Sequence, residues 1–179
     1  KARIFKLLRN FDASQSADLR QEVISLIPVW EELRRLGAAL IPDGLKRAAR
    51  DRLLYYFQQY SRTIVSHREL LIIAGISDWP RRMRELRREL GWPIVSGMTA
   101  KEMQGEGDIV PGDAFPDCSS MRAEDYIMID TEQDREAAFR LKLANDIRKS
   151  RKGARASILE FLQHNVGKPV PGDELRYVA

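Results

Sequence analysis

The chain has 179 residues, of which 44% are apolar, so it can bury the core of one large domain or of two small ones. Its formal net charge of +4 is compatible with a polyanionic partner, whereas its single cysteine, Cys118, excludes an internal disulfide and a thiolate zinc site. No apolar run reaches the roughly 18 residues of a membrane span and no signal peptide is visible, so we expect a cytoplasmic protein with no membrane partner.

The first segment, residues 1–44, predicts a helical arm. Residues 1–11 are typical of a short basic helix. Between Leu19 and Leu40 apolar residues recur at helical spacing, and Pro28 inside this pattern predicts a kink or a break. We expect the arm to pack on the next domain or on a second protomer, in which case the protein is a homodimer.

Residues 45–131 begin with the elements of a helix-turn-helix. An amphipathic helix is expected over 46–60. Ser66 and Glu69 are spaced as a capping box, which opens a short second helix. Gly75 then suits the left-handed residue that ends this helix. A tight turn is therefore expected before the third helix.

The third helix and a wing follow this turn. A helix is expected over 77–90 and strands over 92–96 and 126–129, with a short extended piece over 62–65. The Gly- and Asp-rich stretch 97–120 is interpreted as a long loop. This element order is that of a winged helix-turn-helix with an enlarged wing.

The end of the chain repeats its middle. Residues 46–74 align with 151–179 without a gap, and a helix over 132–150 links the two copies. The identical pairs are Ala49/Ala154, Arg50/Arg155, Leu54/Leu159, Gln58/Gln163, Val65/Val170, Glu69/Glu174, Leu70/Leu175 and Ala74/Ala179. The second copy stops where the first continues into the helix over 77–90. We therefore expect the chain to be a fragment of a longer protein.

These patterns predict a mainly α protein with small β wings, of the α+β class. Its expected parts are a helical arm (1–44), a complete winged helix-turn-helix with a long wing loop (45–131), a linker helix (132–150) and the start of a second, truncated winged-helix unit (151–179).

The helix over 77–90 separates apolar from basic residues. On a wheel of 100° per residue, the apolar residues form one narrow stripe: Trp79, Met83, Leu86 and Leu90. The opposite face carries Arg81, Arg84 and Arg88. Arg82 and Arg87 lie on either side of the stripe. A planar guanidinium can bond guanine O6 and N7 together or bind a phosphate, and the second helix of a helix-turn-helix enters the major groove. The candidate DNA-binding residues are Ser77, Arg81, Arg82, Arg84, Arg87, Arg88, Arg62 and His67.

Two other interpretations of this helix stay open. Glu85 and Glu89 could neutralise the arginines through i,i+3 and i,i+4 pairs, which would leave a salt-bridged surface helix. A winged helix can also dock another protein without touching DNA.

No catalytic or metal-binding constellation emerges from the sequence. His67 and His164 lie far apart, and neither a paired-ligand spacing nor a Gly-rich phosphate loop is present. The carboxylates near the second expected strand lack a lysine at a suitable spacing and are interpreted as strand-end and cap residues; they are Asp125, Asp130, Glu132 and Asp134. We expect this chain to hold no cofactor and to catalyse no reaction.

The stretch 36–97 resembles the N-terminal region of bacterial HNH-type restriction endonuclease homologues, most specifically in its core, residues 79–87. Residues 158–179 look like the second unit of that region, while Pro80 departs from the small helix-forming residue expected there. The resemblance implies the part of a DNA-cutting enzyme that recognises double-stranded DNA. It also implies a separate HNH nuclease domain with a divalent metal.

The residues by themselves leave two other functions open. A tandem winged-helix transcriptional regulator would carry the same helix without a nuclease. A protein-docking module would use the apolar arm over 1–44 to hold a partner.

Overall fold

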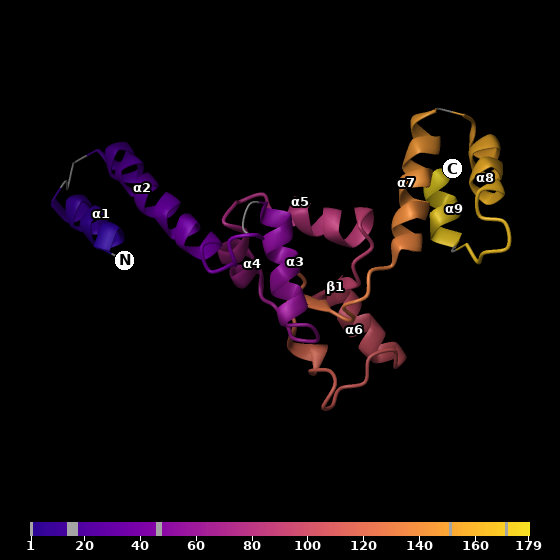
Figure 1. The fold of residues 1–179 in the computed structure, drawn as a ribbon, viewed down its shortest axis with the longest axis horizontal. Coiled ribbons are helices and arrows are strands. Elements are labelled where there is room, and N and C mark those ends of the chain that lie inside the picture. The colour runs from indigo at the N-terminus through magenta and orange to yellow at the C-terminus, as the bar shows by residue number, and fades with distance from the viewer. Residues whose placement is uncertain (1, 14–17, 46–47, 151, 171) are drawn as a thin grey trace.

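The computed structural model describes residues 2–13, 18–45, 48–150, 152–170 and 172–179. These residues are mostly helical, with one two-stranded antiparallel sheet, in agreement with the expected α+β class. An arm of two helices, a central body with the sheet and a C-terminal group of three helices follow one another along the molecule (Figure 1). Within the described ranges every helix is too short or too polar to cross a lipid bilayer.

The arm consists of α1 (Ala2–Ala13) and α2 (Leu19–Ala38), which pack on each other. Of the kink or break expected at Pro28, the break is wrong, because α2 continues through this residue. Pro28 cannot donate to the carbonyl of Ile24, one turn earlier. Both residues are exposed, so water can take the place of the missing donor.

The central body begins with α3 (Ala49–Gln59), α4 (His67–Ala74) and α5 (Trp79–Arg84). The predicted capping box is confirmed, since Ser66 Oγ accepts from the N–H of Glu69 and the Glu69 carboxylate accepts from the N–H of Ser66 over 3.0 Å. Gly75 ends α4 in the left-handed conformation, with φ of 60°, as predicted.

The sheet pairs β1 (Ile94–Ser96) with β2 (Tyr126–Met128) in antiparallel register, with Ile94 opposite Met128. Val65, from the expected extended piece, forms a bridge with Tyr126. Both predicted strands and the extended piece are therefore found where the sequence pattern indicates.

The stretch 97–120 is not a long loop, which corrects the expectation. It contains α6 (Gly97–Glu106) and a single 3-10 turn, η2 (Cys118–Ser120). The side-chain oxygen of Gln104 accepts from the backbone N–H of Cys118 over 2.7 Å and ties the two together. A local core beneath them contains Ala100, Cys118, Met121 and Ile127. The prediction failed because the many Gly and Asp residues are typical of a loop, whereas the structure of this segment depends on a few buried apolar side chains.

The main core lies in the central body and includes α5 and its continuation, η1 (Glu85–Glu89). Its buried members are Leu53, Phe57, Val65, Leu70, Ala74, Met83, Leu86, Ile94 and Met128. The predicted apolar stripe of the helix over 77–90 supplies two of these residues, with Trp79 and Leu90 packed against them. The core thereby fixes which side of that helix faces solvent.

The C-terminal group consists of α7 (Arg135–Lys149), α8 (Ala154–Gln163) and α9 (Gly172–Val178). Its helices α8 and α9 start at the positions aligned with the starts of α3 and α4, although Lys46 and Arg151, the first residues of the two copies, lie outside the described residues. Phe57 is fully buried, whereas the aligned Leu162 is 39% exposed. Within the described part of the second copy, no counterpart of α5 covers this face.

Candidate nucleic-acid interface

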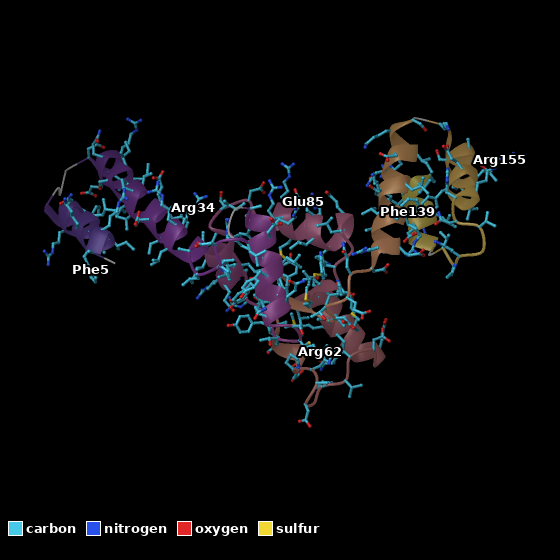
Figure 2. The ribbon with its side chains drawn as sticks, viewed as in Figure 1. Phe5, Arg34, Arg62, Glu85, Phe139 and Arg155 are labelled. Carbon is cyan, nitrogen blue, oxygen red and sulfur yellow. The ribbon has the colours of Figure 1, made fainter. Side chains whose placement is uncertain are left out.

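The two faces predicted for the helix over 77–90 are present; α5 and η1 together are called the basic helix below. Met83 and Leu86 are 1% and 0% exposed, whereas Arg81, Arg84 and Arg88 are exposed. The basic helix is held by its apolar side and presents guanidinium groups to solvent (Figure 2).

The second half of the basic helix is a π-helix, which corrects the α-helix expected as far as Leu90. The backbone N–H of Leu90 donates to the carbonyl of Glu85, five residues earlier, over 3.0 Å. Single π turns inside α-helices are rare and frequently occur at functional sites. A wheel of 100° per residue therefore describes this half only approximately.

Arg87 is the arginine most engaged with the protein. Its Nε donates to the carbonyl of Ile94 over 2.7 Å, and its guanidinium lies 5.5 Å from the centroid of the Tyr126 ring. Burial lowers the pKa of Arg87, yet a guanidinium keeps its charge in a protein. Arg87 thus adds positive charge while its position is fixed by β1 and β2.

Arg81 and Arg82 share one carboxylate. Arg82 hydrogen-bonds Glu85, and Arg81 Nε lies 3.6 Å from the same Glu85 side chain. The hydrogen bond with Glu85 raises the pKa of Arg82. The interpretation as a salt-bridged surface helix therefore describes these two arginines.

Arg84 and Arg88 differ from their neighbours. Both are exposed, and among the residues that the structure describes no carboxylate forms an ion pair with either guanidinium. Two charged groups on one side of a helix, without internal partners, are available to an external anion.

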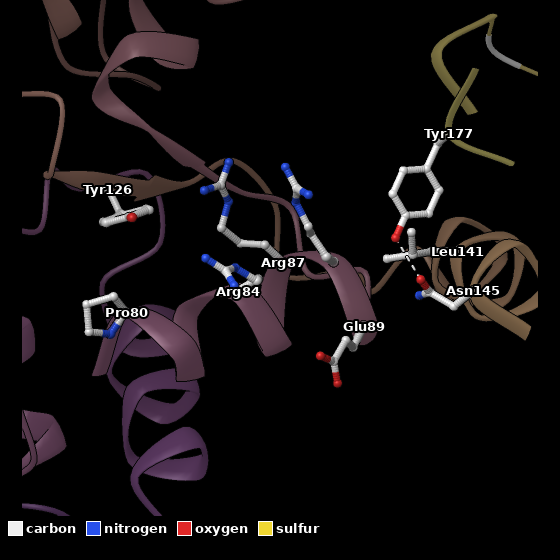
Figure 3. A pocket seen from close by; sticks show the side chains of 9 residues that line it. Pro80, Arg84, Arg87, Glu89, Tyr126, Leu141, Asn145 and Tyr177 are labelled. Carbon is white, nitrogen blue, oxygen red and sulfur yellow. Dashed lines mark hydrogen bonds between the residues drawn. The ribbon is translucent and has the colours of Figure 1, made fainter. Parts of the chain in front are cut away.

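A cleft of about 570 Å³ opens beside the basic helix. One wall is formed by the basic helix and β2, and the other by α7 and α9 (Figure 3). The lining residues are Pro80, Arg84, Arg87, Arg88, Glu89, Tyr126, Leu141, Asn145 and Tyr177. Because three guanidinium groups outnumber one carboxylate, the cleft attracts anions.

Ser77 and Arg62, two further predicted site residues, do not line this cleft. Ser77 is exposed in the turn between α4 and α5. The N–H of Arg62 donates to the carbonyl of Met128 over 2.8 Å, and its guanidinium lies 4.9 Å from the ring centroid of Phe115. Arg62 therefore packs on the segment between α6 and η2.

His67 lies in acidic surroundings. Its Nδ1 is 3.7 Å from Glu124 Oε1 and 3.9 Å from Asp125 Oδ1. These carboxylates would repel a phosphate, so the cleft and His67 offer opposite electrostatic environments. Of the eight predicted residues, the structure gathers only Arg84, Arg87 and Arg88 in one cavity.

The second wall of the cleft contains residues that the sequence did not indicate. Leu141 and Asn145 come from α7 and Tyr177 comes from α9. No motif connects them with the basic helix, because they reach it only through the packing of α7 against η1.

Asp134 is the N-cap of α7, in line with the prediction for the acidic residues near β2, and accepts from the N–H of Ala137 over 2.9 Å. Asp125 directly precedes β2 and accepts from the N–H of Arg122 over 2.8 Å. No group of three His, Cys, Asp or Glu side chains within the described ranges is placed to hold a metal ion.

Residues 50–135 match the family model described as the KpnI N-terminal domain. No curated protein and no solved structure matches the chain. The matched range begins at the second residue of α3 and extends beyond β2, so it contains the whole basic helix. The family match supports the coarser part of the resemblance: residues 50–135 are similar to the N-terminal region of a restriction endonuclease.

Proposed function

We propose that this chain is the DNA-recognition region of a restriction endonuclease and that the basic helix contacts duplex DNA. The observation that carries the proposal is the exposure of Arg84 and Arg88 without carboxylate partners, on a helix anchored by Met83 and Leu86. Outward guanidinium groups on a packed helix can bind phosphates and guanine edges without reordering of the backbone.

The finer assignment follows the sequence resemblance. In it, α3, α4, the basic helix and the β1–β2 pair form a winged helix-turn-helix whose third helix enters the major groove. In this assignment Arg84 and Arg88 make the main contacts with DNA. The neighbouring arginines of the same helix, Arg81, Arg82 and Arg87, add positive charge beside them. Ser77, Arg62 and His67 lie at the edge of the interface. DNA cleavage belongs to an HNH nuclease domain with a divalent metal, outside these 179 residues.

Duplex binding tests this proposal. A fluorescently labelled duplex pool of random sequence is titrated with the wild-type chain and with the double variant Arg84→Ala/Arg88→Ala, and anisotropy is measured. DNA of random sequence is bound mainly through its phosphates, and a hydrogen bond to a charged group contributes about 1.5–3 kcal/mol, so we expect the affinity to fall at least tenfold. Arg155→Ala, an exposed arginine on α8, is the matched control and should leave the affinity unchanged. Equal affinity of the double variant and the control would refute the proposal.

We also propose that α2 dimerises with a second copy of the chain. On a helical wheel of 100° per residue, six apolar side chains of α2 lie within about 120° of one another and form a stripe. Each of them is 39–73% exposed, although α1 packs on α2. The six are Leu19, Val23, Leu26, Ile27, Trp30 and Leu33. With Phe5 and Leu8 of α1, these half-exposed side chains offer on the order of 700 Å² per copy, close to the ~800 Å² per partner of stable interfaces.

Light scattering coupled to size exclusion tests the dimer. Trp30→Glu places a charge in the centre of the stripe and should convert a dimer of about 41 kDa into the 20.6 kDa monomer. Ile24→Glu is the matched control, because Ile24 is 42% exposed but lies about 140° from Leu19 on the wheel. A monomeric wild-type chain, or dissociation by both variants alike, would contradict dimerisation through this stripe.

A further inference from the structure

The cleft beside the basic helix combines two kinds of wall. Arg84, Arg87 and Arg88 supply three guanidinium groups on one side, and Glu89 supplies the single carboxylate. Figure 3 shows the side chains of Arg84 and Arg87 extending beside the ring of Tyr126. This side of the cleft offers an anion several donors at once.

The opposite wall presents an aromatic ring that is held in place. Tyr177 donates its hydroxyl to Asn145 Oδ1 over 2.7 Å (Figure 3), and the guanidinium of Arg148 lies 4.4 Å from the centroid of its ring. Tyr177 nevertheless remains 39% exposed. The amide nitrogen of Asn145 is not used by the bond to Tyr177, so it can donate to a ligand.

The volume of the cleft decides which ligand fits. At about 570 Å³ it lies within the ~300–1,000 Å³ of small-molecule sites, whereas the major groove of a duplex is by itself about 12 Å wide. A duplex can therefore contact the exposed side chains of Arg84 and Arg88 from outside the cleft, but it cannot enter the cleft. A single nucleotide that has left its stack carries both a phosphate for guanidinium groups and a base for an aromatic ring.

We propose that the cleft binds one unstacked nucleotide of a DNA strand, with its phosphate on Arg84 and Arg88, its base against the ring of Tyr177 and the base edge at Asn145. This inference rests on the proposed function, because the strand reaches the cleft along the basic helix. The nucleotide comes from a single-stranded end or gap, or it is turned out of a duplex at the cost of its stacking.

Binding of three DNAs tests the inference with the full chain. They share one random-sequence pool and are a continuous duplex, the same duplex with one unpaired nucleotide in a bulge, and the single strand. Stacking of a base on an aromatic side chain corresponds to about 5- to 150-fold in affinity. We expect the bulged duplex to bind at least fivefold more tightly than the continuous duplex. Tight binding of the single strand as well identifies strand ends or gaps as a source, whereas preference for the bulge alone identifies the turned-out nucleotide.

Variants of Tyr177 identify the site. Tyr177→Ala should abolish the preference for the bulge and leave binding of the continuous duplex unchanged, which also shows that the variant is folded. Tyr177→Phe keeps the ring and should keep the preference. Tyr60→Ala removes a 50% exposed tyrosine outside the cleft and should change neither affinity.

Two results would overturn the inference. If the wild-type chain binds bulged and continuous duplexes equally, or if the preference survives Tyr177→Ala, the cleft does not take up a nucleotide, while the proposed function stands. If the wild-type chain binds none of the three DNAs, both the inference and the proposed function fail.

Discussion

Tyr56 and Glu69 form a contact between α3 and α4 that the second copy of the repeat replaces. Tyr56 donates its hydroxyl to the Glu69 carboxylate over 2.7 Å. The aligned residues are Phe161 and Glu174, and Glu174 pairs instead with Arg140 of α7 over 3.1 Å. The shared glutamate therefore serves a different partner in each copy, because its neighbours are set by the surrounding helices.

The ionisation of Glu69 links this contact to stability. Burial alone would raise its pKa, but hydrogen bonds from Tyr56 and from Ser66 outweigh burial, so the pKa of Glu69 is lowered in the folded state. A lowered carboxyl pKa stabilises the protein above the ordinary value of 4.5, and the contribution is lost as the pH falls below it. Glu69→Gln should thus make the free energy of unfolding less dependent on pH between about 5 and 3.

Urea unfolding at several pH values measures this dependence. Tyr56→Phe gives an intermediate case, because it removes one of the hydrogen bonds that lower the pKa of Glu69 and keeps the Ser66–Glu69 capping box. It should cost about 1 kcal/mol near neutral pH and weaken the pH dependence less than Glu69→Gln does. If Glu69→Gln loses stability in acid as steeply as the wild-type chain, the carboxylate does not make the assigned contribution.

Among the elements, those with local signals were predicted and those fixed by distant contacts were not. The Ser66–Glu69 capping box and Gly75 defined α4 correctly, since each acts within one turn. The π segment was missed because the shift of the Leu90 N–H to the carbonyl of Glu85, five residues earlier, leaves no local pattern of residue types. Likewise, the helical periodicity of residues 77–90 predicted the basic face of the candidate site. It did not predict the opposite wall of the cleft, which α7 and α9 form.

A substitution at Gly91 tests how much the junction between the basic helix and α7 contributes to stability. The φ of Gly91 is 68°, and a Cβ there would lie 2.1 Å from the carbonyl oxygen of Asp134, so Gly91→Ala should destabilise the protein by more than about 1 kcal/mol. Gly105→Ala in α6 is the control, because the added Cβ meets nothing within 4 Å, and it should stabilise by about 0.5–1 kcal/mol. Thermal unfolding distinguishes the two. Similar midpoints for both variants would show that the close approach at Gly91 is not important.

In the molecule as a whole, the cleft exists because α7 is tied to the end of the basic helix. The N–H of Asp134 donates to the carbonyl of Gly91 over 2.9 Å, and the amide of Gln133 donates to the carbonyl of Leu90 over 2.5 Å. These bonds place α7 and α9 beside the end of the basic helix (Figure 1), where residues of both helices line the cleft. The repeat was visible in the sequence, but this junction was not, because backbone bonds between distant segments leave no pattern of residue types.

The dependence of duplex affinity on salt measures whether the exposed guanidinium groups of the basic helix contact DNA phosphates. Each phosphate contact contributes about 0.9 to the slope of log K against log salt concentration. Arg84→Ala/Arg88→Ala should lower the magnitude of this slope by about 1.8 relative to the wild-type chain, while Arg155→Ala should leave it unchanged. Identical slopes for the wild-type chain and the double variant would show that these guanidinium groups do not contact phosphates.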